Sequence, residues 1–556
     1  MKSAVPASIR RLESTPSRVR YLILFPLLLA AAVTQAAPVD EGQSGAVIYR
    51  QGVLPSGNPL VGTRTGGGGI EGRAAACANC HRRSGLGTTE GNIVIPPIIA
   101  EYLFRSAAKN NVDMNMPHVS GQRTQRAPYN DTTLARAIRD GVDPEGRQLN
   151  YLMPRFQLDD ATMTSLITYL KNLTSGPVPG VTDDTLHFAT IITPDADPTE
   201  RQGMLDVLER FFADKNEFIR GGGRRLHTSR EILYRVQRKW QLHVWQLSGA
   251  ADTWPQQLQQ KLAAEPVYAV ISGLGGGNWA PVHQFCERAA LPCLLPNVDL
   301  PVVAENDFYP VYFSKGVLLE AALIAHQLRV EKHAEGVHRL LQIYRAGDSG
   351  EQAAKALSST SAADGVRVEN RALHAGDPRR ALERFLREAR AGDSVMLWLR
   401  PNDLALLPAR PAEGVRVFVS GLMGGLEHAP LRAAWRSVTR MTYPFDLPAL
   451  RQVRMNYPLG WFKVRHISVV AERVQSDTYL ACGILAETLN DMLDSFVRDY
   501  LVERVEVMLS HRIITGYYPR LGLAPGQRFA SKGAYLAHFA QPEGTQLLAD
   551  GDWTVP

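Results

Sequence analysis

The pattern of apolar and polar positions changes character near residue 180. Before this point apolar residues recur every three or four positions, as at Met163, Leu166 and Leu170, and this spacing predicts amphipathic helices. Beyond it, short apolar runs alternate with helical segments, which predicts parallel sheets with helices on both faces. Glycines and prolines between residues 176 and 180 interrupt both patterns. We therefore expect two differently built regions joined by a linker.

The first region is predicted to be a small helical unit. Gly52 and Gly141 each follow a helical segment and are expected to end it, while Asp159 and Asp160 open the clearest helix. The glycine run at residues 66–69 lacks the Lys-Ser/Thr of a phosphate-binding loop and is interpreted as a flexible surface turn. The predicted helices lie at about residues 45–52, 131–141 and 159–173.

The second region is too long for one enormous sheet, so two α/β lobes are predicted. The chain is expected to cross between the lobes near Tyr312, Tyr443 and Tyr517. The predicted strands lie at residues 186–192, 242–247, 267–271 and 293–295 in the first lobe, and at 340–344, 366–368, 394–399 and 415–419 in the second. The predicted helices of the first lobe lie at residues 201–213, 254–263 and 280–290.

The N-terminus has the layout of a secretory signal peptide. Arginines precede an apolar run at residues 21–33, and Thr34-Gln35-Ala36 offers small residues for cleavage. The apolar run is short for a membrane span, and an uncleaved anchor is the alternative. We expect export to the periplasm, with no stable membrane span after cleavage. The predicted segments are a signal peptide at 1–36, a helical domain at 37–176, a linker at 177–183 and an α/β domain at 184–556.

The length of 556 residues favours two or three domains, and an apolar fraction of 45% with 21% charged residues is typical of globular proteins. The formal net charge is +6 for the whole chain. Residues 1–36 carry +4 of it, so the remainder is close to +2. This near-neutral balance gives no argument for a nucleic-acid partner.

The run Cys77-Ala78-Asn79-Cys80-His81 is the pattern of a covalent attachment site for c-type haem. Two thiols at this spacing reach the two vinyl groups on one edge of a porphyrin, and the following imidazole reaches the iron. The motif therefore predicts one covalently bound haem c, with Cys77 and Cys80 as tethers and His81 as an iron ligand.

Two other interpretations of the motif are half of a zinc site and a redox dithiol. Zinc needs further N or S ligands, and the remaining cysteines, Cys286, Cys293 and Cys482, are more than 200 positions away. Cys286 and Cys293 flank a predicted helix end in a chain expected to reach an oxidising compartment. They are expected either to pair, with Cys482 left free, or to remain two buried thiols.

Residues from about 44 to 176 resemble class I cytochromes c. The resemblance rests on the C-x-x-C-H run, on the later loop Tyr151-Leu152-Met153-Pro154 and on the terminal helix with Leu166-Ile167-Thr168-Tyr169-Leu170. It implies thioether bonds at Cys77 and Cys80, His81 as the proximal iron ligand and Met153 as the distal one. A thioether ligand suits low-spin iron and raises its reduction potential.

Other residues compete for the sixth iron position. Met163 lies on the apolar stripe of the last helix and is interpreted as core, whereas Met114, Met116 and His118 occupy a polar stretch. His118 is the main alternative because two imidazoles would also give a low-spin electron carrier. With both axial positions filled, electron transfer is favoured over oxygen or peroxide chemistry.

Residues that follow the haem motif are candidates for supporting contacts with the imidazole and the haem. The resemblance implies that a proline carbonyl accepts the proton of the proximal imidazole, and Pro96 and Pro97 are the candidates. Arg82 and Arg83 either meet haem propionates or are solvated.

Residues from about 184 to 556 resemble type I periplasmic binding proteins, the branched-chain amino acid receptor family. The resemblance rests on the order of strands and helices and on two segments, Tyr309–Gly316 and Tyr344–Glu351. It implies a cleft between two lobes, with Ser272 and Asp348 in loops that face it. No full set of amino-acid-binding residues is evident, so any small-molecule solute is unidentified.

The glycine-rich loop at residues 272–278 lies between a predicted strand and helix. Ser272 and Gly273 open it, and backbone amides at a helix start favour a ligand anion. A tight strand-to-helix turn is the alternative. The loop fails as a dinucleotide fingerprint because Asn278 replaces the final glycine.

The sequence as a whole predicts an exported monohaem cytochrome fused to a solute-binding-like domain. We expect an electron carrier or binding protein rather than an enzyme. A periplasmic redox partner is expected, with a quinoprotein dehydrogenase as one example. The alternatives are a transporter-type solute receptor with an accessory haem domain, and a haem peroxidase-like enzyme.

Overall fold

The computed structural model describes residues 41–104, 126–174, 176–222, 238–335, 339–374, 376, 378–492 and 494–556. The expected signal peptide and the alternative iron ligands Met114, Met116 and His118 lie outside the described residues. Within the described ranges, no helix combines the length and the apolar character needed to cross a membrane.

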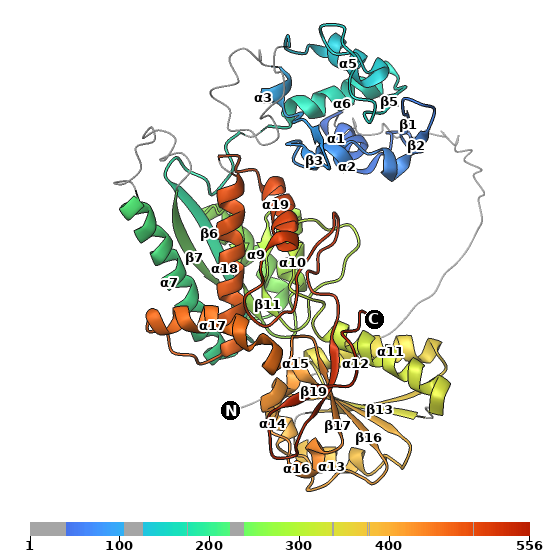
Figure 1. The fold of residues 1–556 in the computed structure, drawn as a ribbon, viewed down its shortest axis with the longest axis vertical. Coiled ribbons are helices and arrows are strands. Elements are labelled where there is room, and N and C mark those ends of the chain that lie inside the picture. The colour runs from blue at the N-terminus through green and yellow to red at the C-terminus, as the bar shows by residue number, and fades with distance from the viewer. Residues whose placement is uncertain are drawn as a thin grey trace, which may run out of the picture. The chain divides into compact units, whose positions relative to one another are not determined.

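The predicted helices of the first region are confirmed (Figure 1). Gly52 and Gly141 follow their helices with φ of 67° and 70°, the left-handed conformation that favours glycine. Asp159 begins the last helix by accepting a hydrogen bond from the backbone N–H of Thr162. The helices are α1 (Glu41–Gln51), α2 (Ala78–His81), α3 (Ala100–Leu103), α5 (Asp131–Asp140) and α6 (Asp160–Asn172).

Short strands make the expected all-α description of this region incomplete. The strands β1 (Val61–Thr63), β2 (Gly69–Glu71) and β5 (Arg155–Phe156) form an antiparallel sheet. A hairpin of β3 (Thr88–Glu90) and β4 (Ile93–Ile95) lies beside the haem motif in sequence. Strands of two or three residues are too short for an alternating pattern to show in the sequence. The core is nevertheless helical, because α1 packs against α6.

The second region begins with a seven-stranded sheet whose pairings are all parallel. β6 pairs with β7, β8 and β9, and the order continues through β10 to β12. The strands are β6 (Thr185–Ile192), β7 (Lys239–Gln246), β8 (Ala269–Ile271), β9 (Leu274–Gly275), β10 (Cys293–Leu294), β11 (Asn297–Val298) and β12 (Pro310–Val311). Its helices are α7 (Pro198–Gly222), α9 (Trp254–Ala264) and α10 (Ala280–Arg288).

A second seven-stranded sheet follows in the order β14-β13-β15-β16-β17-β18-β19. It is parallel up to β17, and the last two strands add antiparallel. The strands are β13 (Arg339–Arg345), β14 (Arg367–Leu373), β15 (Ser394–Trp398), β16 (Arg416–Ser420), β17 (Thr439–Tyr443), β18 (Tyr535–Phe539) and β19 (Leu547–Ala549).

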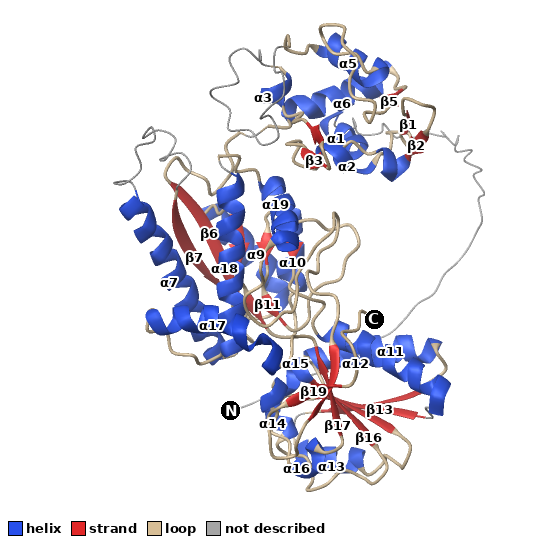
Figure 2. Ribbon diagram, viewed as in Figure 1, coloured by secondary structure: helices blue, strands red, loops and turns tan. Residues whose placement is uncertain are grey.

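Helices lie on both sides of this second sheet, with α11 and α12 on one side and α13 and α16 on the other (Figure 2). The predicted alternation of strands and helices is therefore confirmed. The helices of this sheet are α11 (Val317–Glu335), α12 (Ser349–Ala363), α13 (Pro378–Leu386), α14 (Pro401–Leu404), α15 (Gly421–Gly424) and α16 (Ala433–Arg436).

Three late helices return to the first sheet before the chain ends in the second. They are α17 (Pro448–Val464), α18 (Glu472–Met492) and α19 (Arg498–His511). α18 packs against α7 and touches β11, both of the first sheet, whereas β18 pairs with β17 of the second. The chain therefore changes sheets after β12, after β17 and again before β18.

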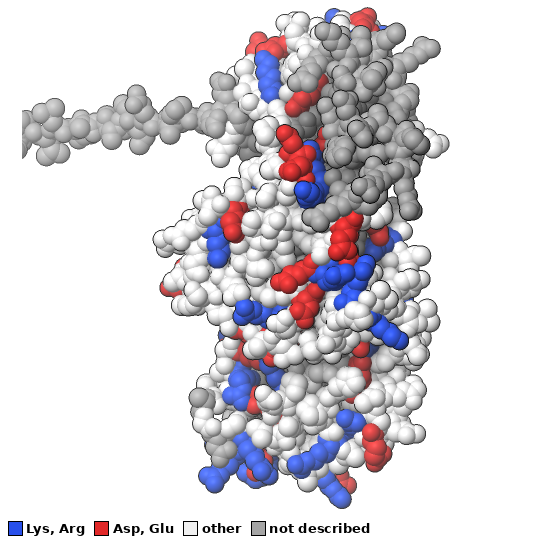
Figure 3. Space-filling model, turned by 90° about the vertical axis from the view of Figure 1, so that its left-hand side faces the viewer, with Lys and Arg blue, Asp and Glu red and all other residues white. Residues whose placement is uncertain are grey.

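Charges of both signs are intermixed on the face shown in Figure 3. Lys and Arg side chains alternate there with Asp and Glu side chains. The described residues of this face therefore form no extended basic patch of the kind that binds nucleic acid.

Candidate functional site

One helical turn brings the haem-motif residues together. Cys77 precedes α2, and Cys80 and His81 belong to it. The backbone N–H of His81 donates to the carbonyl of Cys77 at 2.9 Å, which closes the turn. Residues three and four apart lie on the same face of a helix. The sequence spacing therefore places both thiols and the imidazole on one side of the segment.

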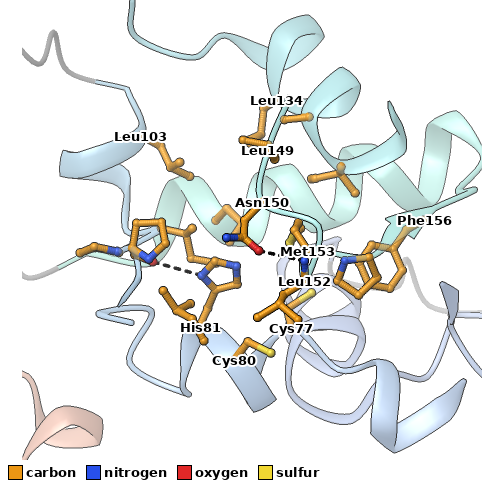
Figure 4. A pocket seen from close by; sticks show the side chains of 18 of the residues that line it. Cys77, Cys80, His81, Leu103, Leu134, Leu149, Asn150, Leu152, Met153 and Phe156 are labelled. Carbon is orange, nitrogen blue, oxygen red and sulfur yellow. Dashed lines mark hydrogen bonds between the residues drawn. The ribbon is translucent and has the colours of Figure 1, made fainter. Parts of the chain in front are cut away.

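These three side chains line a cavity of about 490 Å³, within the range of roughly 300–1,000 Å³ typical of ligand sites. Met153, predicted from a distant loop, lines the same cavity (Figure 4). The other lining side chains are largely apolar and include Ile95, Leu103, Leu134, Ile138, Leu149, Phe156, Leu166 and Leu170. A roomy apolar cavity with two thiols, one imidazole and one thioether fits a covalently tethered haem.

His81 is held by a backbone carbonyl. The side chain is 8% exposed, and its Nδ1 lies 3.1 Å from the carbonyl oxygen of Pro96. Burial lowers the pKa of His81 against the opposing hydrogen bond to Pro96, so the neutral imidazole is favoured. In that form Nδ1–H donates to Pro96 and leaves Nε2 as the atom able to bind a metal. Of the two prolines considered from the sequence, Pro96 is the one in contact.

The thiols do not resemble a reactive dithiol. Burial raises the pKa of the Cys77 thiol to about 12, and burial also raises the pKa of Cys80. Redox-active and nucleophilic cysteines instead have lowered pKa values. The described residues also contain no group of three or more His, Cys, Asp or Glu side chains arranged to hold a metal ion. Neither the redox nor the zinc interpretation gains support.

A hydrogen-bonded loop presents Met153 to the cavity. The N–H of Met153 donates to the carbonyl of Asn150 at 3.0 Å, and the N–H of Leu152 donates to the Asn150 side chain at 2.9 Å. The guanidinium of Arg155 donates to the carbonyl of Met153. By contrast, Met163 is buried in the helical core and is not among the cavity-lining residues, as the sequence pattern indicated.

The arginines beside the motif point elsewhere than expected. Arg82 pairs with Glu506 at 2.6 Å, and Arg83 lies 3.4 Å from Asp499. Neither lines the cavity, so they are neither solvated nor placed for haem propionates. Buried carboxylates of α19, remote in sequence, bind both guanidinium groups instead.

Among the described residues, the arginines that line the cavity are Arg64, Arg126 and Arg147. Arg126 lies over the rings of Tyr102 and Tyr129, with its guanidinium carbon 5.0 and 4.6 Å from their centroids. Sequence reasoning missed all three, because single arginines in loops carry no spacing signal. They are the candidates for contact with anionic groups of a bound cofactor.

The predicted cleft residues lie where the two sheets approach each other. The side chain of Ser272 is buried, and its hydroxyl pairs with Thr478 of α18 at 2.9 Å and accepts from Asn297 at 3.1 Å. Gly273 packs against the ring of Trp279, where a Cβ would lie only 2.6 Å from a ring carbon. The hydroxyl of Ser272 is thus already satisfied within the chain.

Asp348 begins α12 and forms an ion pair. Burial would raise its pKa, but contact with the Arg400 guanidinium holds the pKa of Asp348 below its usual value. Arg400 also reaches Asp299, which follows β11 of the first sheet, at 3.0 Å. One arginine therefore links the two sheets through two carboxylates.

A cavity of about 20 Å³, large enough for about one water molecule, also lies between the sheets. Its lining includes Asn297, Arg473, Asp477 and Tyr518, but not Ser272, Gly273 or Asp348. Asp477 is fully buried, and neither carboxylate oxygen has a hydrogen-bond partner. Its nearest cation is Arg473, at 3.6 Å. The sequence analysis did not single out Arg473 and Asp477, because a pair of opposite charges four positions apart is common on exposed helices.

Cys286 and Cys293 are both buried and are not joined by a disulfide. The alternative of two buried thiols therefore describes this structure. Cys482 is likewise buried, within α18.

Comparison with known proteins assigns the first region. Residues 72–174 match the family model described as cytochrome c. These residues include the haem motif, Pro96 and Met153. No curated protein sequence matches the chain significantly.

Solved structures similar to this chain include substrate-binding proteins. A fatty acid ABC transporter substrate-binding protein from Thermomonospora curvata is 13% identical, covers 68% of this chain and 95% of its own, and gives a TM-score of 0.46. A substrate-binding periplasmic protein from Ralstonia solanacearum is 13% identical. The match covers 66% of this chain and 100% of that protein, with a TM-score of 0.47.

A branched-chain amino acid ABC transporter protein from Thermus thermophilus with bound valine is 8% identical. The match covers 67% of this chain and 97% of that protein, with a TM-score of 0.45. At these identities and TM-scores, no ligand or residue role follows from the three structures. The chain thus contains a cytochrome c domain at residues 72–174 and a longer α/β region to which periplasmic substrate-binding proteins are similar.

Proposed function

We propose that this protein is an exported monohaem c-type cytochrome that carries single electrons. Cys77 and Cys80 form the thioether bonds, and His81 and Met153 bind the iron. The observation that supports this proposal is one apolar cavity lined by both thiols, the imidazole and the thioether. The haem iron supplies one-electron redox chemistry.

The protein residues orient the ligands and exclude water. The carbonyl of Pro96 accepts the Nδ1 proton of His81, which directs Nε2 to the metal and increases the basicity of the ring. The Asn150 hydrogen bonds fix the loop of Met153, whose thioether favours the reduced iron. With His81 and Met153 both bound, no coordination position is open to a substrate. This arrangement favours electron transfer over peroxide turnover.

We further propose the domain plan of a signal peptide at residues 1–36, a cytochrome domain at 37–176, a linker at 177–183 and a two-lobed α/β domain at 184–556. Covalent haem attachment takes place in exported proteins, so the periplasm is the proposed location. A periplasmic redox protein, for example a quinoprotein dehydrogenase, is the proposed electron partner.

A second candidate function is solute recognition by the α/β region. The observation that favours it is the cavity between the sheets, where the buried carboxylate of Asp477 has no hydrogen-bond partner. A small polar solute with a hydrogen-bond donor would satisfy this group when the two lobes separate. A rise in melting temperature with amino acids or short amines would support this function. If no compound of this panel raised the melting temperature, solute recognition would be contradicted, and recognition of a protein partner would remain as the role of the α/β region.

Carbon monoxide tests the first proposal. The holoprotein is reduced and its absorption spectrum is recorded before and after addition of the gas. An iron held by both His81 and Met153 gives an unchanged spectrum. A rapid, complete spectral change would instead indicate an open iron position and contradict the carrier proposal.

A further inference from the structure

Three acidic residues follow one face of α19. Asp499, Glu503 and Glu506 stand four and three positions apart, so they project on the same side of the helix. Glu503 and Glu506 are each only 3% exposed. Buried carboxylates destabilise a fold unless hydrogen bonds or cations compensate them. The groups that compensate these carboxylates therefore show what α19 holds in place.

The partners are the three consecutive residues that follow His81. Arg82 donates to Glu506 at 2.6 Å, and Arg83 lies 3.4 Å from Asp499. Ser84 gives Glu503 two hydrogen bonds, from its N–H at 2.9 Å and from its hydroxyl at 2.6 Å. The segment after the haem motif is thus bound residue by residue to one helix face.

Additional contacts complete this network. Arg528 donates to Glu506, and the hydroxyl of Tyr309 donates to Asp499 at 2.5 Å. These contacts compensate Glu506 and Asp499 with groups from outside the haem segment. Glu503 differs, because within the described ranges its hydrogen bonds come from Ser84 alone.

Arg82 has an unfavourable backbone conformation. Its φ is 64° and its ψ is 165°, a region that side chains with a Cβ rarely adopt. The hydroxyl of Tyr49 donates to the carbonyl of Arg82 at 2.6 Å, and the side chain is held by Glu506. Such a conformation persists only where the surroundings fix it.

The same turn reaches the carbonyl that orients His81. The N–H of Gly87 donates to the carbonyl of His81 at 3.1 Å. Gly87 has a φ of 78°, and a Cβ there would collide with the carbonyl of Ile95, next to Pro96. Ser84, which binds Glu503, also accepts from the N–H of Leu86 at 3.2 Å, and Leu86 is followed by Gly87, which lies close to the carbonyls of Ile95 and Pro96. The turn fixed by Glu503 therefore adjoins the carbonyl that orients the imidazole.

We propose that Glu503 and Glu506 of α19 are positioning residues of the haem site, which hold the turn after His81 and lower the reduction potential of the iron. This inference rests on the proposed haem function. Through α19, the α/β region contributes directly to the electronic properties of the cytochrome domain. Buried negative charge favours the oxidised, more positive iron, so its removal favours the reduced form.

Redox titration of the holoprotein tests the electrostatic part. Glu503→Gln and Glu506→Gln remove one charge with little change of volume, while Glu487→Gln is the matched control, an exposed carboxylate of α18. At a pH well above neutral, each buried variant is expected to raise the ratio of reduced to oxidised haem at a fixed potential by about tenfold, which is 59 mV for one electron. The control is expected to change it less than about twofold. Ratios equal to the control in both buried variants would overturn the proposal.

Hydrogen exchange tests the positioning part without using the haem. Glu503→Ala removes the acceptor of the Ser84 N–H, so the peptide containing residues 82–87 is expected to exchange at least about tenfold faster. Glu487→Ala is the control. Unchanged exchange in folded Glu503→Ala protein would contradict the positioning role. If the wild-type protein proved to carry no covalent haem, the proposed electron-transfer function would be refuted. The hydrogen-exchange measurement would still show whether Glu503 holds the segment at residues 82–87.

Discussion

The haem region and the α/β region handle buried polar chemistry in opposite ways. In the first, a cavity of about 490 Å³ collects two thiols, an imidazole and a thioether, with only the imidazole nitrogen Nδ1 fixed by the chain. In the second, the cavity between the sheets has about 20 Å³, and the predicted cleft groups Ser272 and Asp348 already have partners. The difference separates a preformed cofactor site from a narrow cleft in which the predicted binding groups are already bound by other residues of the chain.

The strongest test of the preformed site is removal of one tether. Cys80→Ala leaves a single thiol for the porphyrin, so we expect loss of normal haem maturation. Acid acetone should leave the haem of the wild type attached, and it should extract any haem from Cys77→Ala/Cys80→Ala, which has neither tether. Cys482→Ala, which removes a buried thiol of α18, should retain covalent haem. Normal maturation of Cys80→Ala would contradict the assignment.

Loss of the distal ligand should have the next largest effect. Met153→Ala removes the thioether, so the reduced iron becomes open to carbon monoxide and the reduction potential falls by on the order of 0.1 V, within the ~0.8 V range that axial ligands span. Potentiometry and gas titration measure both changes. Met163→Leu, a volume-conserving change in the helical core, is the control. A Met153→Ala protein that still excludes the gas would point to another sixth ligand, with His118 the first to test.

The pH dependence of stability probes Asp477, which lines the cavity between the sheets. Burial raises the pKa of Asp477 to about 7, against the opposing effects of Arg473 and Arg451. The folded protein therefore binds this proton more tightly than the unfolded chain, whose Asp has a pKa near 3.8. The free energy of unfolding should consequently decrease as the pH rises from about 4 to 7, by on the order of 2–4 kcal/mol from this group.

Asp477→Asn should flatten that part of the profile, as measured by denaturant unfolding at a series of pH values. Glu320 has the same sign of shift, since burial raises its pKa to about 7, and Glu320→Gln is the matched comparison. A profile of Asp477→Asn parallel to that of the wild type would show that the Asp477 carboxylate does not titrate in this range.

The smallest effect is expected at the ion pair between the sheets. Arg400→Ala breaks contacts with Asp299 and Asp348, but the arginine side chain is 40% exposed. Exposed ion pairs contribute about 1 kcal/mol or less. We expect a correspondingly small loss of stability at low salt and almost none at high salt. A larger, salt-independent loss would indicate that this pair holds the two sheets together.

Local sequence patterns determined much of this protein by themselves. The C-x-x-C-H spacing, the glycines after α1 and α5, the aspartate before α6 and the alternation of strands and helices each depend on residues close in the chain. Such interactions are short in range, so spacing alone predicts them. The Met-Pro loop was also identified from sequence, and the structure places Met153 in the cavity with His81.

Tertiary structure alone decided which distant groups meet. Arg82 and Arg83 were expected at propionates or in solvent, but α19, more than 400 positions away, provides buried carboxylates for them. The choice of Pro96, the cavity arginines and the complete burial of Asp477 likewise depend on contacts that no local pattern encodes. The physical reason is that the pairing of a buried charge is set by the whole packing around it, whereas helix ends and the haem motif are set within a few residues.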